Sequence, residues 1–268
     1  MRNLLLELYR RDRLLTLVAA VHLALFVVMV AAAAGDDRRL LGVNVWIKPI
    51  KFAISIAIYV STIAWILPTA PGPRWAHGVI RWGVSVAMLT EMTLIALQSA
   101  RGATSHFNET TPFDAAIFSV MGLMIGFNTC LEGLLLALYF CRGVLLAPAY
   151  LWGIRWGLLL GIFAAVIGGI MVFRGAHTVG AKDGNAGVWL LNWSTTAGDL
   201  RIAHALGLHA LQILPLLGWL LSRRVSTWQS VAVVTVVAIA YSAVTCLVLL
   251  EALAGRPNLL PGAFAGRG

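Results

Sequence analysis

The chain has 268 residues, of which 60% are hydrophobic and only 12% are charged, and its mean hydropathy is +0.86. A water-soluble domain carries charge on about a quarter of its residues, so the composition excludes that class and predicts an integral membrane protein. The net charge of +9 does not indicate nucleic-acid binding, because it forms no basic stripe interleaved with aromatic residues. Membrane topology signals and attraction to anionic lipid account for it instead.

Several apolar runs approach or exceed the length of about 18–20 residues that a transmembrane helix needs. We therefore expect an all-α polytopic helical bundle, with residues 1–268 forming a single transmembrane domain. The predicted helices, about seven in number, span residues 14–34, 49–67, 79–99, 112–140, 150–173, 197–221 and 228–253. The cysteines lie within or beside these helices without zinc-site spacing, and we expect small core residues at Cys130, Cys141 and Cys246.

The first helix follows a basic segment, residues 1–13, and has His22 near its middle. The second helix has Pro49 in its first turn, where proline costs no hydrogen bond. Polar residues recur along the second helix at helical spacing and form one stripe, which we expect to face protein or water rather than lipid. The stripe consists of Lys48, Lys51, Ser55, Tyr59 and Thr62.

The third helix places Glu91, Gln98 and Arg101 on one face. A glutamate inside a membrane segment costs free energy unless it is paired, and is therefore a candidate functional residue. The alternative is a purely structural ion pair with Lys51 or an arginine. The sequence leaves both interpretations open.

The polar loop RGATSHFNETTPFD leads into the fourth helix. Thr111 and Asp114 have the spacing of a capping box and Pro112 occupies the first turn, so we expect the helix to begin there. The loop and the fourth helix carry further polar candidates: Ser105, His106, Asn108, Asn128 and Glu132.

The longest connection, RGAHTVGAKDGNAGVWLLNWSTTAGD, precedes the sixth helix. A loop of this length without helical pattern is typically functional or disordered. Thr196 and Asp199 have capping-box spacing, from which we expect the helix to start near residue 197. At about 100° per residue, the polar residues of this helix share roughly 140° of one face: Arg201, His204, His209 and Gln212.

Seven crossings place the loops after the first, third and fifth helices on one side of the membrane, and these loops hold most of the polar chemistry. The opposite loops contribute basic residues and no acidic one: Arg74, Arg142, Arg223 and Arg224. Together with the basic N-terminal segment, these loops favour a cytoplasmic N-terminus. We expect a multi-pass protein of a bacterial inner (cytoplasmic) membrane with an outward-facing polar pocket.

Three phrases resemble a family of uncharacterised bacterial multi-pass membrane proteins: NVWIKPIKF, ARGATSHFNETTPFDAAIF and HTVG…NWSTTAGDLRIAHALGLHALQ. The resemblance covers the second to the sixth predicted helix, and its motifs are long enough to be specific. It implies a polytopic membrane fold and carries no activity over to this chain.

The leading hypothesis is a haem or transition-metal site for membrane redox chemistry, because imidazole suits haem iron, zinc and copper. His22 and His209 lie at similar depths from opposite ends of their helices and could form a bis-histidine haem pair. The other residues expected to bind this cofactor are His204, Arg201, Arg101, Gln212, Glu91, Gln98 and Lys51. For a metal ion alone, the expected ligands are His106, His204, His209 and Asp114.

A zinc hydrolase related to seven-helix ceramidase-like enzymes is disfavoured. Those proteins use histidines four apart on one helix, whereas His204 and His209 are separated by an extra residue and point away from each other. Whether the protein is an enzyme at all stays undecided by the sequence.

Two other classes stay open. A small-molecule or proton-linked transporter or binding protein could use a relay of Lys51, Glu91, Glu132 and Glu251, with basic residues receiving an anion or a quinone headgroup. The apolar inner halves of the second, fifth and sixth helices disfavour a continuous pathway. An accessory subunit or a homo-oligomer is the third class, because tryptophans suit contacts with a protein partner as well as with the membrane interface.

Overall fold

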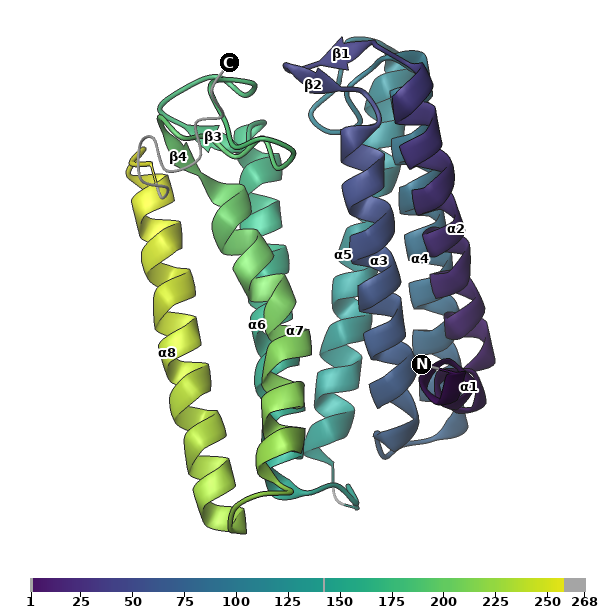
Figure 1. The fold of residues 1–268 in the computed structure, drawn as a ribbon, viewed down its shortest axis with the longest axis vertical. Helices are drawn as coiled ribbons and strands as arrows, with labels where there is room; N and C mark the ends of the chain where they lie inside the picture. Colours follow the sequence, from purple (N-terminus) through teal and green to yellow (C-terminus); the bar gives the residue numbers. More distant parts are fainter. Residues whose placement is uncertain (1, 142, 258–268) are drawn as a thin grey trace. The chain divides into compact units, whose positions relative to one another are not determined.

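The computed structural model describes residues 2–141 and 143–257, so the predicted basic residue Arg142 lies outside the described residues. The chain divides into two compact units, residues 1–145 and 146–268, each of which is described by itself. The all-α class is confirmed, because seven of the described helices are long and apolar enough to cross a membrane (Figure 1). The single transmembrane domain stays a prediction.

Unit 1 is built from α1 to α5. Its long helices are α2 (Arg13–Gly35), α3 (Ile47–Ile66), α4 (Arg74–Arg101) and α5 (Pro112–Phe140). The short elements are α1 (Arg2–Arg11), the 3-10 turn η1 (Leu67–Thr69), and the antiparallel strands β1 (Arg39–Leu40) and β2 (Val43–Asn44). The core between the long helices is made of aliphatic residues that are fully buried, among them Leu15, Ala53, Val60, Ile63 and Ile95.

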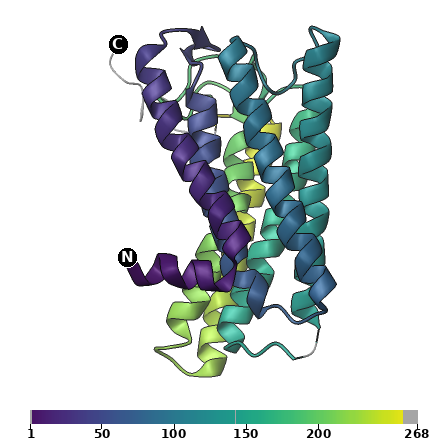
Figure 2. The same ribbon diagram turned by 90° about the vertical axis from the view of Figure 1, so that its right-hand side faces the viewer.

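The chain breaks between α1 and α2 because Asp12 caps α2. Its carboxylate accepts a hydrogen bond from the Leu15 amide at 3.1 Å and pairs with the Arg81 guanidinium of α4 at 2.5 Å. Figure 2 shows α1 lying across the long axis of α2. This helix was not predicted from the sequence. Three of its leucines are exposed, Leu4, Leu5 and Leu6, while Leu8 is buried. This arrangement is typical of an amphipathic helix at a membrane surface.

A second carboxylate holds the connection between α2 and α3. Asp36 accepts a hydrogen bond from Arg38 Nη2 at 2.7 Å and another from the Trp46 indole at 2.8 Å. The bond from Arg38 and then the bond from Trp46 hold the pKa of Asp36 well below its ordinary value. The ionised group therefore ties the β1–β2 hairpin to the start of α3.

Unit 2 contains three long helices and a small two-stranded sheet. The helices are α6 (Pro148–Arg174), α7 (Leu200–Leu221) and α8 (Thr227–Leu253), and the strands are β3 (Thr178–Val179) and β4 (Gly198–Asp199). The antiparallel pairing joins Thr178 to Asp199 and Val179 to Gly198. It ties the two ends of the connection between α6 and α7 together.

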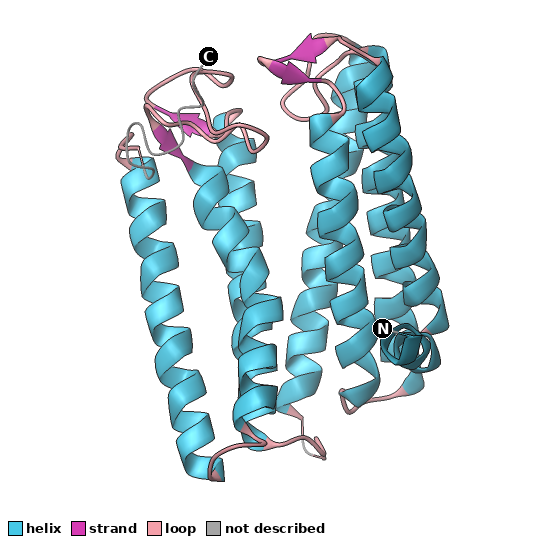
Figure 3. Ribbon diagram, viewed as in Figure 1, coloured by secondary structure: helices cyan, strands magenta, loops and turns pink. Residues whose placement is uncertain are grey.

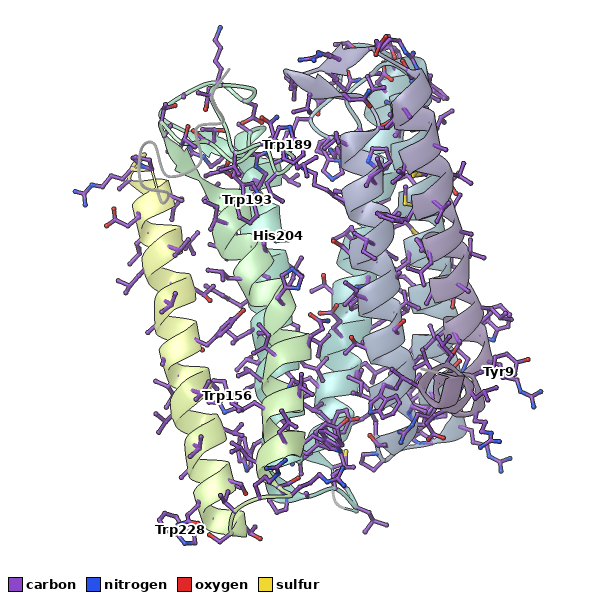
Figure 4. The ribbon with its side chains drawn as sticks, viewed as in Figure 1. Tyr9, Trp156, Trp189, Trp193, His204 and Trp228 are labelled. Atoms are coloured by element: carbon purple, nitrogen blue, oxygen red, sulfur yellow. The ribbon has the colours of Figure 1, made fainter. Side chains whose placement is uncertain are left out.

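Small residues let α6 and α7 approach closely. A Cβ added to Gly157 would lie 2.9 Å from the Leu211 Cα, and one added to Gly153 would collide with the Leu214 carbonyl. Such close backbone approach is how membrane helices gain packing energy where lipid supplies no hydrophobic drive. Beside this contact, Trp156 packs against a cluster formed by Leu160, Ala210, Leu214 and Ala238 (Figure 4).

The predicted start of the sixth transmembrane helix is wrong. α7 begins at Leu200, and Asp199 is its N-cap, accepting from the Arg201 amide, while Thr196 lies beside Asn185 in the preceding loop. Gly198 contacts the backbone of Ala252 so closely that no Cβ would fit. This contact with α8 keeps the chain extended up to Asp199, at the end of the long loop in Figure 3.

The expectation for the cysteines is also wrong. Cys130, Cys141 and Cys246 are free and exposed on the surface of the chain rather than in its core. The apolar runs around them are membrane-spanning helices, in which hydrophobic residues face outward as readily as inward. Apolar neighbours in the sequence therefore do not indicate burial in such a chain.

Candidate functional site

The site centres on Glu91, in the middle of α4 of unit 1. Its side chain is only 2% exposed, and Oε2 has no hydrogen-bond partner among the described residues. Oε1 lies 4.0 Å from His106 Nε2. Buried carboxylate oxygens are nearly always hydrogen-bonded, so the unpartnered oxygen of Glu91 requires an explanation.

Aromatic rings hold His106 in place at the end of the bundle. Its ring centroid lies 5.9 Å from that of Phe52 on α3 and 6.2 Å from that of Phe118 on α5. Phe107 contacts the ring at 6.1 Å and adopts a φ of 55°, a left-handed conformation that costs free energy in a bulky residue. The loop thus accepts backbone strain while it directs the imidazole at Glu91.

Lys48 completes the charge arrangement from the first turn of α3. The charge of Lys48 acts on Glu91, and its ammonium lies 5.8 Å from the Phe52 ring centroid. The sequence left Lys51 or an arginine open as a structural partner of Glu91. Lys51, one helical turn further along α3, is half-buried. The lysine charge that acts on Glu91 is that of Lys48, the neighbouring member of the predicted stripe.

Asp114 has a different role from Glu91. Its carboxylate accepts hydrogen bonds from Gln98 Nε2 at 2.8 Å, Arg101 Nη1 at 2.6 Å and the Thr111 hydroxyl at 2.7 Å. The predicted capping box is confirmed, since Thr111 in turn accepts from the Asp114 amide. Three predicted site residues, Gln98, Arg101 and Asp114, therefore form one network, in which the carboxylate that was expected to bind a metal already holds the start of α5.

A second polar cluster lies further along the helices of unit 1. The Tyr59 hydroxyl and the Asn128 side chain exchange hydrogen bonds at 2.9 and 3.1 Å, and Asn128 Nδ2 donates to Glu132 at 3.2 Å. These contacts join α3 to α5. The predicted relay residue Glu132 thus has hydrogen-bond partners, in contrast to Glu91 Oε2.

In unit 2, Asp183 organises the loop after α6. It accepts hydrogen bonds from His177 Nδ1 at 2.7 Å and from the backbone amides of His177 and Thr178. Burial opposes ionisation of Asp183, but the hydrogen bonds and charge of His177 outweigh it and hold the pKa of Asp183 well below its ordinary value. The sequence indicated a functional or disordered loop here, but no spacing in it predicted the His177–Asp183 pair.

Asp199 and Arg201 form a second pair in unit 2. Asp199 is fully buried and accepts from Arg201 Nε at 2.9 Å, from Arg201 Nη2 at 2.5 Å and from the Ser194 amide at 2.7 Å. Arg201 Nη2 also donates to the Asn192 carbonyl. The arginine that was expected to hold a cofactor propionate or an anion is engaged in closing the loop onto α7.

The predicted histidines have different surroundings. His22 is fully buried in unit 1, with its ring nitrogens 2.7 Å from the Val18 carbonyl and 3.3 Å from the Met88 carbonyl. His204 Nδ1 lies 2.7 Å from the Ala164 carbonyl of α6, and Gln212 is half-buried on the same helix. His209 is exposed on α7 and makes no hydrogen bond with the described residues.

No group of three or more His, Cys, Asp or Glu side chains is arranged to hold a metal ion within residues 2–141 and 143–257. His22 belongs to unit 1 and His209 to unit 2, so the bis-histidine haem pair stays a prediction. Comparison with models of protein families, with curated proteins and with solved structures found no match.

Proposed function

We propose that this chain is a multi-pass membrane protein of the proton-linked transport or small-molecule binding class, in which Glu91 binds and releases a proton. His106 is its proton partner and Lys48 the nearby fixed charge. A bacterial inner membrane with a cytoplasmic N-terminus remains the proposed location, supported by the purely basic loops in the sequence.

One observation carries the proposal: a buried carboxyl group inside a candidate membrane span keeps an oxygen without a hydrogen-bond partner among the described residues. A buried ionisable residue in a membrane segment is expensive and is typically part of an ion or proton pathway. Asp114 lies near the same end of the bundle and is fully hydrogen-bonded. The lack of hydrogen bonds at Glu91 Oε2 is therefore not a general property of the acidic residues in this unit.

The Glu91–His106 pair has two arrangements of equal total charge. Either the carboxylate faces an imidazolium, or a carboxylic acid faces a neutral imidazole. Moving one proton between them converts one arrangement into the other once Glu91 Oε1 and His106 Nε2, which are 4.0 Å apart, approach to hydrogen-bond distance or share a water molecule. His106 is the more exposed partner and lies in the loop, so it can exchange the proton with water or with a ligand.

The test compares proton uptake by purified protein after a pH jump in weakly buffered detergent solution, followed with an indicator dye. We expect Glu91→Gln to take up about one proton fewer per chain than the wild type. Glu109→Gln removes an exposed carboxyl from the adjacent loop and serves as the control for net charge. Equal uptake by the Glu91→Gln variant and the wild type would contradict the proposal.

A haem or metal site on α7 is the second candidate function. It is favoured by His209, an exposed imidazole within a candidate span that has no hydrogen-bond partner among the described residues. An imidazole in that position needs a partner or a cofactor. Absorption spectroscopy with elemental analysis on gently purified protein tests this. A Soret band or stoichiometric metal that His209→Ala abolishes would support the site. Wild-type protein with neither signal would rule the site out.

A further inference from the structure

An open cavity of about 300 Å³ lies at the end of α7 in unit 2. Its lining residues are Trp219, Leu220, Arg223 and Arg224. They come from the last turn of α7 and the short connection to α8, where a candidate membrane span ends. The volume is at the lower end of the range for small-ligand sites, which suits a compact headgroup.

The charge at this end of unit 2 is entirely positive. Segments 146–157 and 216–232 contain Arg155, Arg223 and Arg224 and no acidic residue. The start of α6 belongs to this end, because Gly218 packs against the Ala149 carbonyl. Among the described residues, neither Arg223 nor Arg224 forms a salt bridge, whereas Arg201 of the same unit does. The two cavity arginines thus lack the carboxylate partner that Arg201 has.

Aromatic stacking positions one of these arginines. The Arg223 guanidinium carbon lies 4.9 Å from the Trp219 ring centroid, a cation–π contact that orients the guanidinium plane. A planar guanidinium can bind a phosphate through two parallel hydrogen bonds. Trp219 therefore organises Arg223 for an anion in addition to lining the cavity.

The start of α8, three residues after Arg224, has backbone amides without a hydrogen-bond partner among the described residues. α8 begins at Thr227, and its N-cap Ser226 makes no capping hydrogen bond from its side chain. The Ser226 hydroxyl donates instead to Gln229 Oε1 at 2.7 Å. The first-turn amides therefore keep unused donors, and the positive end of the helix dipole favours an anion there.

We propose that this cavity binds the phosphate of an anionic phospholipid headgroup. A lipid fits better than free phosphate because the phosphate-binding groups adjoin exposed apolar surface at the end of the span. Leu216, Leu220 and Trp228 are 56%, 46% and 73% exposed, and the acyl chains would lie along the first two (Trp228 is labelled in Figure 4). Tryptophan is enriched at the headgroup level of membranes, and basic pockets there bind anionic headgroups.

The experiment measures lipid retention by native mass spectrometry, with phosphatidylglycerol or phosphatidylcholine added to the delipidated full chain. We expect selective retention of phosphatidylglycerol by the wild type. The double variant R223Q/R224Q should bind it about 30-fold more weakly, since each basic side chain near an anionic surface contributes about a factor of five. Arg174→Gln, an exposed arginine at the other end of α6, is the matched control and should bind like the wild type.

A second double variant distinguishes loss of lipid binding from misfolding. R223K/R224K keeps both charges and should retain most of the affinity while losing the two-pronged contact. Equal retention of the two lipids by the wild type, or wild-type affinity in R223Q/R224Q, would overturn the proposal. Displacement of phosphatidylglycerol by inorganic phosphate at millimolar concentration and constant ionic strength would assign the site to free phosphate and would equally overturn it.

Discussion

Two buried carboxyl groups, Glu91 in unit 1 and Asp199 in unit 2, show opposite patterns of hydrogen bonding. Both are almost completely shielded from solvent, at 1% and 0% exposure. Asp199 accepts hydrogen bonds on both oxygens from Arg201 and from the Ser194 amide. Glu91 has one oxygen 4.0 Å from His106 and another without a partner among the described residues.

The difference distinguishes a carboxyl group that stabilises the fold from one that we propose to exchange a proton. A buried charge whose hydrogen bonds are all made is held in one state, because protonation would break those bonds. A buried acid with few hydrogen bonds gives up few of them when it gains a proton, and burial itself disfavours its charged form. Asp199 fixes the loop onto α7 through its hydrogen bonds, whereas the proposed proton exchange at Glu91 uses a carboxyl group with few of them.

The largest expected effect on stability comes from breaking the Asp199–Arg201 ion pair. Asp199→Asn leaves Arg201 without its counter-charge. We expect a loss of about 3 kcal/mol in the free energy of unfolding, because removing one partner of a buried ion pair leaves the other charge without a partner. Denaturant unfolding in detergent measures this loss. The control Asp37→Asn removes an exposed aspartate and should change stability by less than about 0.5 kcal/mol. If both variants unfold alike, Asp199 does not hold the loop.

A smaller, pH-dependent effect is expected at Asp183. Because its folded pKa is lowered, the stability that it contributes is present above the ordinary aspartate pKa of about 4 and is lost as the pH falls further. Asp183→Asn should therefore cost on the order of 2 kcal/mol at neutral pH and progressively less in acid. Thermal unfolding of both proteins across that range measures the difference. A deficit that stays constant with pH would contradict the ionised pair with His177.

The smallest effect on stability is expected at Glu91. Glu91→Gln removes a charge with few hydrogen bonds, so we expect a change in the free energy of unfolding of less than about 1 kcal/mol, in either direction. The same unfolding assay that is used for Asp199→Asn measures it. A loss as large as that of Asp199→Asn would identify Glu91 as a structural acid and remove the contrast between the two sites.

Predictions from local patterns were correct where no distant contact intervened and wrong where one did. The start of α5 was predicted because Thr111 and Asp114 cap it within three residues. α1 was missed because the break between it and α2 is made at Asp12, whose carboxylate both caps α2 and pairs with Arg81 of α4. The start of α7 was misplaced because contact with Ala252 of α8 keeps Gly198 extended.

The candidate site shows the same limit. Glu91 could be singled out from the sequence because acids are rare in membrane spans. The pairing of Glu91 with His106 could not be predicted, since the loop folds back through ring contacts with Phe52 and Phe118 from two other helices. The signal available in advance was weaker: a histidine flanked by a serine and a phenylalanine in a short polar loop, without spacing that points to Glu91.

Infrared difference spectroscopy between acidic and alkaline conditions tests the central claim most directly, because a carboxylic acid has a carbonyl band that a carboxylate lacks. We expect the wild type to show a band that appears on acidification, that is absent from Glu91→Gln, and that shifts in His106→Gln because the neighbouring ring is gone. Asp199→Asn, where it folds, should leave this band unchanged. A band that persists in Glu91→Gln would contradict proton exchange at Glu91 and would place the titrating acid elsewhere.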